Sequence, residues 1–252
     1  MIEASEVALL GGRVRCFQPT SGYRSAIDPV FLAASVGAEA GQTVLDVGTG
    51  AGAAALCLAT RVDGVCVIGL EQQPEMAALA VRGVEASGLA ARVEVVVGDL
   101  LEPPGELAPG GFDHVFANPP YGEAGRENPP PDPTKAASTV EGVARLADWL
   151  AFCGRMVRDG GSVTIVHRAE RVGEILALMG AILGGLVVFP LWPGETREKP
   201  AKRVLVQGRK GVKTPLTMAP GLVLCTADGG YTREAEAVLR HGTPIALAAV
   251  DT

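Results

Sequence analysis

The segment FANPPYG, residues 116–122, contains the residues with the clearest chemical meaning. An apolar run stops at Asn118, and the prolines that follow cannot continue a central strand because each lacks the N–H that a sheet ladder needs. The side-chain oxygen of Asn118 and the carbonyl of Pro119 can accept the two hydrogens of an amino group, while Pro120 keeps the turn rigid and Tyr121 offers a flat face to a planar group. Asparagine is no base, so these residues suit the placement of a weakly nucleophilic nitrogen opposite an already reactive centre.

A glycine-rich turn precedes this segment and could cradle a nucleotide-like ligand. The run Asp46-Val47-Gly48-Thr49-Gly50-Ala51-Gly52 follows an apolar, β-branched stretch and leads into a helical one. Glycines here allow a tight turn and a close approach of the ligand to the backbone. The dinucleotide pattern GxGxxG would need glycine at position 53, where this chain has Ala53. Alanine is tolerated there, so spacing alone leaves a dinucleotide open.

Two further acids end the next two predicted strands. Glu71 comes 19 residues after Gly52, where a carboxylate can accept hydrogen bonds from ribose hydroxyls. Asp99 follows Gly98 at the end of the next strand, where it can receive an adenine amino group. The neighbours Gln72 and Leu100 are expected to share this cofactor site. Because ligands of α/β sheets bind at the carboxyl edge, these residues are expected to meet there.

The elements that must position these residues alternate along the chain from about residue 30 onward. Apolar runs predict seven strands, at residues 43–48, 65–71, 93–99, 114–119, 162–167, 186–191 and 203–208. Helical spacing lies between the early strands, for example at residues 53–62 and at 74–88, where Gly88 is a plausible C-cap. This alternation predicts an α/β, Rossmann-like, doubly wound sheet of seven strands, mostly parallel, with an antiparallel edge strand.

We expect two parts: a short amino-terminal cap, residues 1–29, and a main domain, residues 30–252. The cap contains GYRSAIDP, with Tyr23, Arg24 and Asp28. Residues 122–139 are polar, proline-rich and without periodicity, which in a compact domain is typical of a functional loop or of disorder.

Composition narrows the classes of protein. With 48% hydrophobic and 20% charged residues, the chain is globular in character. The five cysteines are scattered without a CxxC pair and the three histidines are dispersed, so neither a disulfide framework nor a metal site is expected. The start lacks the features of a signal peptide, and the uncharged run 175–193 is interrupted by Gly184-Gly185, which favours a helix followed by a strand over a membrane span. The expected location is the cytoplasm, and monomer and homodimer both stay open.

One segment departs from the net charge of -6. Residues 195–213 contain seven basic and two acidic side chains, a local net of +5. Such a run can be a solvated face, but a basic stripe beside a sheet strand also suits RNA phosphates. Trp149 falls on the apolar face of a helix and is expected in the core.

Asp46, two residues before the first glycine, gives the turn the form DxGxGxG, which resembles class I S-adenosylmethionine-dependent methyltransferases. The tetrapeptide at 118–121 resembles the (N/D)PP(Y/F) motif of amino-group methyltransferases. From about residue 18 to 240 the chain is similar to the tRNA1(Val) adenine-37 N6-methyltransferase family; the segments that carry this resemblance are QPTSGYRSAIDPVFLAA, the glycine turn, ANPPYG, GGSVTIVHRAERVGEIL, KPAKRVLVQGRKG and GGYTREAEAVLR.

The resemblance implies methylation of the adenosine at position 37 of a tRNA, with S-adenosylmethionine as methyl donor and S-adenosylhomocysteine as product. It implies three sets of residues. The catalytic set is Asn118, Pro119, Pro120 and Tyr121; the cofactor set is Asp46, Gly48, Thr49, Gly50, Gly52, Glu71, Gln72, Asp99, Leu100 and Asn118; the substrate set is Tyr23, Arg24, Asp28, Arg197, Lys199, Lys202 and Arg203.

Ala26 and the loop ENPPPDPTKAAS depart from the family's pattern and leave the exact RNA open. A glutamine N5-methyltransferase of release factors shares NPPY but typically has a separate helical amino-terminal domain, and fewer than 30 residues precede the first elements here. A ribosomal guanine N2-methyltransferase and a binding module without turnover also stay open.

Overall fold

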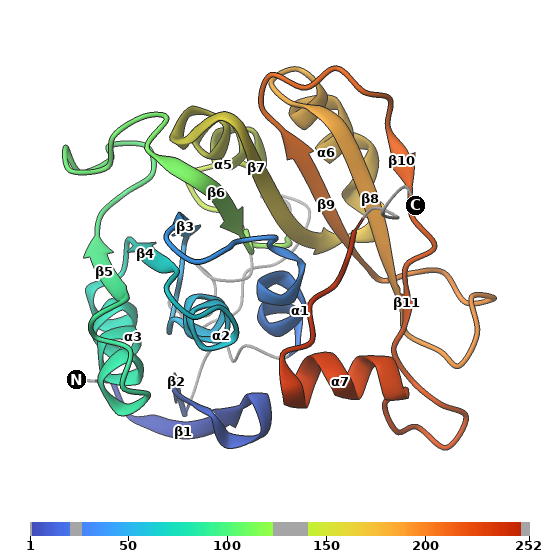
Figure 1. Ribbon diagram of the computed structural model, residues 1–252, viewed down its shortest axis with the longest axis horizontal. Helices are drawn as coiled ribbons and strands as arrows, with labels where there is room; N and C mark the ends of the chain where they lie inside the picture. Colours follow the sequence, from blue (N-terminus) through green and yellow to red (C-terminus); the bar gives the residue numbers. More distant parts are fainter. Residues whose placement is uncertain (1, 21–26, 123–140, 248–252) are drawn as a thin grey trace.

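The computed structural model describes residues 2–20, 27–122 and 141–247. These residues form a nine-stranded sheet with helices on both faces (Figure 1). Seven longer strands make up most of it: β3 (Thr43–Val47), β4 (Cys66–Glu71), β5 (Val93–Val97), β6 (Phe112–Ala117), β7 (Val157–Arg168), β8 (Gly184–Trp192) and β9 (Arg203–Arg209). Two short strands, β10 (Thr217–Met218) and β11 (Leu222–Val223), pair in parallel with β8.

The sheet order is β10-β8-β9-β7-β6-β3-β4-β5. Strand β9 runs antiparallel to both of its neighbours, β7 and β8, and the other pairings in the sheet are parallel. The predicted doubly wound, mostly parallel sheet is therefore confirmed, with its antiparallel strand in the β8 half. Successive strands extend the sheet from β3 in one direction through β4 and in the other through β6, so the topology reverses beside β3. That reversal leaves a crevice at the carboxyl ends of β3 and β6.

The two faces of the sheet have separate apolar cores. One core packs under α1 (Asp28–Ser35), α2 (Ala53–Arg61), α3 (Pro74–Ala86) and α7 (Arg233–His241), and the other under α5 (Leu146–Met156) and α6 (Val172–Gly180) (Figure 1). Strand β9 shows why: Leu205 belongs to the first core, and its neighbours Val204 and Val206 belong to the second. Alternate side chains of a strand point to opposite faces, so a strand covered on both faces must be apolar throughout.

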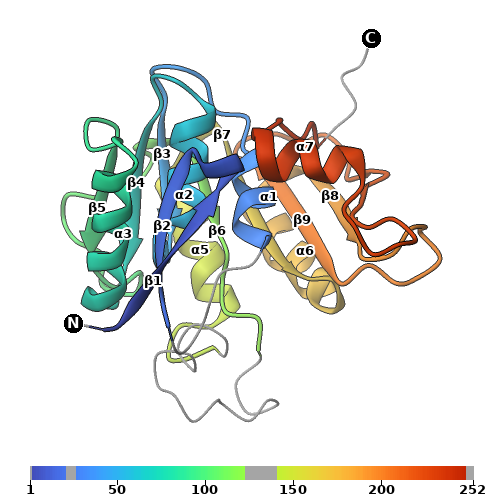
Figure 2. The same cartoon turned by 90° about the horizontal axis from the view of Figure 1, so that it is seen from below.

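The amino-terminal residues form an antiparallel hairpin of β1 (Ala4–Leu9) and β2 (Val14–Pro19), which is separate from the main sheet. Between its strands lies a short 3-10 helix, η1 (Leu10–Gly12). Figure 2 shows the hairpin beside α2 and α3. Arg15 N–H donates to the Ser87 hydroxyl over 3.0 Å, and the Arg82 guanidinium lies 3.9 Å from the Phe17 ring centroid, so α3 holds the hairpin. Since α1 begins at Asp28, the predicted boundary after residue 29 falls inside its first turn.

The uncharged run 175–193 divides as predicted into a helix and a strand. After a 3-10 turn, η2 (Ala169–Arg171), helix α6 ends at Gly180 and β8 begins at Gly184. Among the residues that the structure describes, no helix is both long and apolar enough to cross a membrane.

Candidate functional site

The glycine turn after β3 is fixed to the neighbouring strand by its own backbone. Gly48, Gly50 and Gly52 have φ angles of 68°, 58° and 80°, in the left-handed region that favours glycine. Thr49 N–H donates to the carbonyl of Leu70 over 2.9 Å, and Gly50 N–H donates to Glu71 Oε2 over 2.8 Å. The turn therefore needs glycine for its conformation and Glu71 for its position.

A tryptophan closes over this turn. A Cβ placed on Gly48 would lie 2.4 Å from the Trp149 ring, so the indole of α5 packs directly on the glycine backbone. Trp149 is half-buried: it packs against the apolar core under α5 and α6, as the sequence predicts, and it also lines the cavity above the turn. The helical pattern showed that this residue faces the protein, but it could not show that a cavity opens at that place.

The acid of the turn is buried and hydrogen-bonded. Asp46 is 2% exposed, and the Thr49 hydroxyl donates to its Oδ2 over 2.6 Å. Burial raises the pKa of Asp46 to about 7, against the opposing effect of the Thr49 hydrogen bond. The charge of this carboxylate is therefore sensitive to any cation that enters the cavity.

The acid at the end of β4 links two backbone segments. Glu71 accepts the Gly50 N–H on one oxygen and the Gln73 N–H, over 2.8 Å, on the other. Burial raises the pKa of Glu71, and the hydrogen bonds that it accepts from backbone N–H groups act in the opposite direction. A carboxylate has about four lone-pair positions, so these two hydrogen bonds leave acceptor capacity on Glu71.

The end of β5 supplies the third acid. Asp99 accepts the Gln72 side-chain amide over 2.7 Å on Oδ2 and the Leu101 N–H over 2.9 Å on Oδ1. Two residues predicted to bind a cofactor, Gln72 and Asp99, are thus hydrogen-bonded to each other across neighbouring strand ends. Leu100 beside them is buried.

One cavity collects most of the predicted residues. It is lined by Asp46, Gly48, Thr49, Gly50, Glu71, Gln72, Asp99, Leu100, Asn118 and Pro120. Gly52, Pro119 and Tyr121 are not part of that lining, and Gly52 is instead the N-cap residue immediately before α2. Further wall residues come from β2, α1, α3 and α5 and had no cofactor role predicted from the sequence, among them Gln18, Pro19, Pro29, Met76 and Trp149.

The tetrapeptide begins where β6 ends. Ala117 pairs with Val47 of β3, so Asn118 starts level with the glycine turn. Its Oδ1 lies 2.7 Å from the Tyr121 hydroxyl, which also lies 2.8 Å from Asp28 Oδ2 at the start of α1. The Tyr121 hydroxyl therefore connects the predicted catalytic residues 118–121 to Asp28, which the sequence resemblance assigns to substrate binding.

Two basic side chains pack around the Tyr121 ring. The Arg203 guanidinium lies 4.4 Å from the ring centroid, and its Nε donates to Asp28 Oδ2 over 3.0 Å. His167, at the end of β7, meets the ring edge-on at 5.1 Å. Burial, together with the charge of Arg171, lowers the pKa of His167 to about 4, so this imidazole is neutral at physiological pH. Arg203 thus covers a Tyr121 face that a planar substrate could use.

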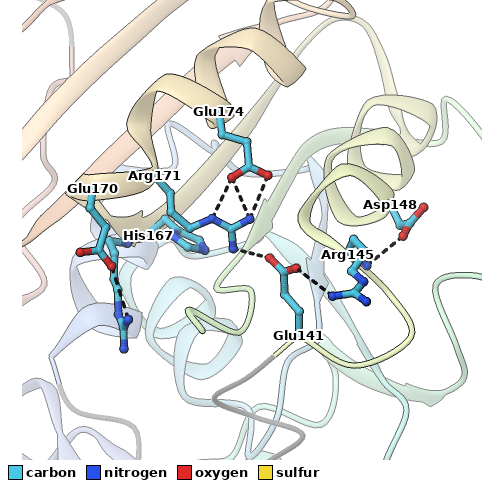
Figure 3. A network of polar contacts seen from close by, with 8 residues as sticks. Glu141, Arg145, Asp148, His167, Glu170, Arg171 and Glu174 are labelled. Carbon is cyan, nitrogen blue, oxygen red and sulfur yellow. Dashed lines mark hydrogen bonds and ion pairs between the residues drawn. The ribbon is translucent and has the colours of Figure 1, made fainter. Parts of the chain in front are cut away.

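An ion-pair network around Arg171 lies next to His167 (Figure 3). The Arg171 guanidinium contacts both Glu141 and Glu174, and Glu141 is buried. Glu141 N–H also donates to the carbonyl of Gly122 over 2.8 Å. Gly122, the first residue of the predicted loop 122–139, and Glu141, which follows that loop, are therefore fastened together beside the tetrapeptide. Residues 123–140 lie outside the described part of the chain, as do Tyr23 and Arg24.

Strand β9 divides the basic side chains of residues 195–213 into two groups. Arg203 pairs with Arg168 at the carboxyl end of β7, whereas Arg209 pairs with Ser162 near the opposite edge of the sheet. Strand β9 separates the two groups by about 20 Å. The exposed residues Arg197, Lys199 and Lys202 precede β9 and share the edge of the tetrapeptide. On the opposite edge, Arg209 and Lys210 donate to backbone carbonyls.

Comparison with known proteins agrees with this geometry. A family model described as "Methyltransferase domain" matches residues 44–128. A tRNA1(Val) (adenine(37)-N6)-methyltransferase of Aeromonas salmonicida is 31% identical over 60% of this chain and 62% of its own length. One from Porphyromonas gingivalis is 34% identical over 63% of this chain and 64% of its own length. The chain thus spans somewhat less than two thirds of these relatives.

Solved structures give the same fold. A crystal structure described as a predicted O-methyltransferase from Agrobacterium tumefaciens superposes with a TM-score of 0.73 at 27% identity and covers 88% of this chain and all of its own. A Thermus thermophilus 16S rRNA N2 G1207 methyltransferase reaches 0.57 at 19% identity, covering 82% of this chain and 50% of its own.

Sheet order, glycine turn and strand-end acids together resemble those of the class I S-adenosylmethionine-dependent methyltransferases. Within this class its sequence is similar to the tRNA1(Val) (adenine(37)-N6)-methyltransferases, which confirms the resemblance found from the motifs. The cofactor is S-adenosylmethionine, and the cavity fits its chemistry. Glu71 keeps acceptor capacity that ribose hydroxyls can use, and buried Asp46 offers a carboxylate to a cation.

Proposed function

We propose that this protein transfers a methyl group from S-adenosylmethionine to the exocyclic N6 of an unpaired adenine in RNA, namely the adenosine at position 37 of a tRNA anticodon loop. The observation that carries the proposal is the position of Asn118. It follows β6 directly, level with the glycine turn, and lines the same cavity. An amide at this point can hold an amino group opposite the donor.

Each part of the site has a distinct task in this proposal. S-adenosylmethionine, when bound, supplies an electrophilic methyl group. Asn118 Oδ1 and the backbone carbonyl of Pro119 accept the hydrogens of the substrate amine and so direct its lone pair toward that methyl group. Because no side chain needs to act as a strong base, placement contributes most of the rate.

The choice of adenine is supported by the names of the relatives. Besides the tRNA enzymes, an rRNA N(6)-adenosine-methyltransferase of Caenorhabditis elegans is 28% identical over 54% of this chain. An anticodon-loop base is already unpaired, so bringing it into the site costs less than extruding a base from a duplex. The exposed group Arg197, Lys199 and Lys202 lies at the same edge of the sheet and would contact phosphates. A tRNA substrate also agrees with a cytoplasmic location.

A glutamine amide of a release factor is the main competing substrate. A release factor glutamine methyltransferase of Geobacter sulfurreducens is 44% identical, but over only 31% of this chain and 26% of its own length. An amide nitrogen and an aromatic amine both need hydrogen-bond acceptors such as Asn118, so the tetrapeptide alone does not distinguish a glutamine substrate from an adenine substrate. Other residues around the tetrapeptide must select between these two substrates.

The deciding experiment offers all substrates together. The protein is incubated with isotopically labelled S-adenosylmethionine, unmodified total RNA and purified release factors, and the products are analysed by nucleoside and peptide mass spectrometry. We expect N6-methyladenosine in the tRNA fraction, mapped to position 37. Labelled glutamine or N2-methylguanosine would contradict the proposal, and cofactor binding without any product would indicate a binding module.

A further inference from the structure

The Tyr121 hydroxyl has more acceptors around it than protons to give. It lies 2.8 Å from Asp28 Oδ2 and 2.7 Å from the amide end of Asn118 that is assigned as Oδ1. A phenol carries one proton, so it can donate to only one of these two partners. Two oxygens at such a distance without a hydrogen between them repel, so the second partner must itself be a donor.

Asp28 is the stronger acceptor. Its Oδ2 also accepts Arg203 Nε–H over 3.0 Å, and its side chain is only 14% exposed. A carboxylate paired with a guanidinium has no proton to donate and forms charge-assisted hydrogen bonds, which are stronger than neutral ones. The tyrosine proton therefore goes to Asp28.

The amide of Asn118 must then turn its other end toward the tyrosine. The two ends of a carboxamide have nearly the same shape, and their assignment follows from the surrounding hydrogen bonds. With the phenol proton on Asp28, the phenol oxygen accepts from Asn118 Nδ2–H. The carboxamide oxygen then points away from Tyr121, and Asn118 lines the cofactor cavity.

We propose that Asp28, acting through the Tyr121 hydroxyl, is a positioning residue that turns the Asn118 carboxamide oxygen toward the substrate amine. The residues of this arrangement come from three separate elements: α1 supplies Asp28, the end of β6 supplies Asn118 and Tyr121, and β9 supplies Arg203. Arg203 stabilises the arrangement twice, by its hydrogen bond to Asp28 and by its position over the Tyr121 ring. This inference rests on the proposed function, because it assigns Asn118 the task of accepting an amine hydrogen.

The first test needs no turnover. In a deuterated sample with protonated tyrosine rings and amides, the Asn118 side-chain NH2 signals are assigned by their loss in Asn118→Asp. We expect a nuclear Overhauser effect between these protons and the ε protons of Tyr121 in the wild type. In Asp28→Ala the phenol proton can move to Asn118, the amide turns over, and the effect should disappear. An absent effect in the wild type, or an unchanged one in Asp28→Ala, would overturn the inference.

The second test uses kinetics on total unmodified tRNA. Tyr121→Phe and Asp28→Ala should each lower kcat about tenfold, roughly what loss of one orienting hydrogen bond costs, with the affinity for S-adenosylmethionine unchanged. The double variant should be no slower than the slower single variant, because both break one chain of contacts. Glu234→Ala, an exposed first-turn acid of α7, is the matched control and should change nothing. Multiplying effects would indicate two independent structural roles and contradict the proposal.

The proposed substrate and the positioning role of Asp28 can fail separately. If the wild type methylates protein and not RNA while the nuclear Overhauser effect is present, the proposed substrate is wrong and the positioning of Asn118 stands. If RNA is methylated and the effect is absent, only the inference about Asp28 fails.

Discussion

The cofactor half of the cavity and the acceptor half are built in different ways. Around the glycine turn, carboxylates hold backbone N–H groups: Glu71 accepts those of Gly50 and Gln73, and Asp99 accepts that of Leu101. Around the tetrapeptide, side chains hold side chains, and Tyr121 meets Asp28, Asn118, Arg203 and His167. A half built from backbone is stiff and serves one constant ligand. A half built from side-chain contacts can exchange partners when a substrate enters.

The largest expected effect separates the two halves by function. Asn118→Ala should lower kcat at least about 1,000-fold, because it removes an acceptor that places the nucleophile. The dissociation constant for S-adenosylmethionine should change less than about threefold, since Asn118 belongs to the acceptor half. Calorimetric titration and a methyl-transfer assay measure both quantities. An equal loss of cofactor binding and turnover would show that the halves are not separable.

The next effect tests the stiffness of the cofactor half. Gly48→Ala introduces a Cβ that would lie 2.4 Å from the Trp149 ring at a φ of +68°. We expect the free energy of unfolding to fall by about 3 kcal/mol, from backbone strain plus overpacking, and cofactor affinity to fall about 100-fold. Chemical denaturation and calorimetry give the two values.

A second glycine provides the control for that prediction. Gly88 has the same φ of +68°, but nothing lies within 4 Å of its Cβ position. Gly88→Ala should therefore cost only the strain of the left-handed backbone, about 1 kcal/mol, and leave cofactor affinity unchanged. If both variants lost equal stability and kept full affinity, the close packing of Trp149 on the turn would have no role in binding.

The same contrast explains what the sequence could predict. The glycine turn, Glu71 and Asp99 follow strands directly, so their places at the sheet edge are fixed by local pattern and by the rule that ligands bind at carboxyl ends. The position of the tetrapeptide at the end of β6 is predictable for the same reason. Its contacts with Asp28 and Arg203 are not predictable from local sequence, because Asp28 lies 93 residues from Tyr121 and 175 from Arg203 in the chain. Asp28 and Arg203 were assigned to the substrate, whereas the structure shows them bonded to each other around Tyr121.

Two further features could not be located in full from the sequence, for the same physical reason. Helical spacing showed that Trp149 faces inward, but whether it meets another side chain or a cavity depends on the approach of the glycine turn. The basic residues from 197 to 213 are close in sequence, but an extended strand separates its two ends. Proximity along a strand therefore does not predict a continuous surface.

A third prediction concerns the charge of Asp46. Its folded pKa of about 7 is raised from the ordinary value of 3.8, so its contribution to stability is full below pH 3.8 and is lost as pH rises through about 7. S-adenosylmethionine is cationic at sulfur and should favour the ionised carboxylate. Cofactor affinity should therefore increase about tenfold from about pH 6 to about pH 8, with release of a proton.

Asp46→Asn sharpens this test because it keeps the shape of the side chain and removes its titration. Calorimetry in buffers of different ionisation enthalpy counts the released proton, and the variant should show a flat pH profile at weaker affinity. A wild-type profile as flat as that of the variant would mean that the cofactor's charge does not reach Asp46.

The smallest expected effect concerns the two edges of the sheet. Lys199 and Lys202 are exposed at the edge of the tetrapeptide, and Lys213 is exposed toward the opposite edge. If RNA phosphates lie along the first edge, Lys199→Ala and Lys202→Ala should each raise KM for tRNA about threefold and reduce the slope of log affinity against log salt by about one, because each removes one phosphate contact. Lys213→Ala carries the same change of charge and should alter neither quantity. Equal effects at both edges would mean that RNA responds to the overall charge of the protein. RNA binding at the edge of the tetrapeptide would then not explain how the acceptor half selects its substrate.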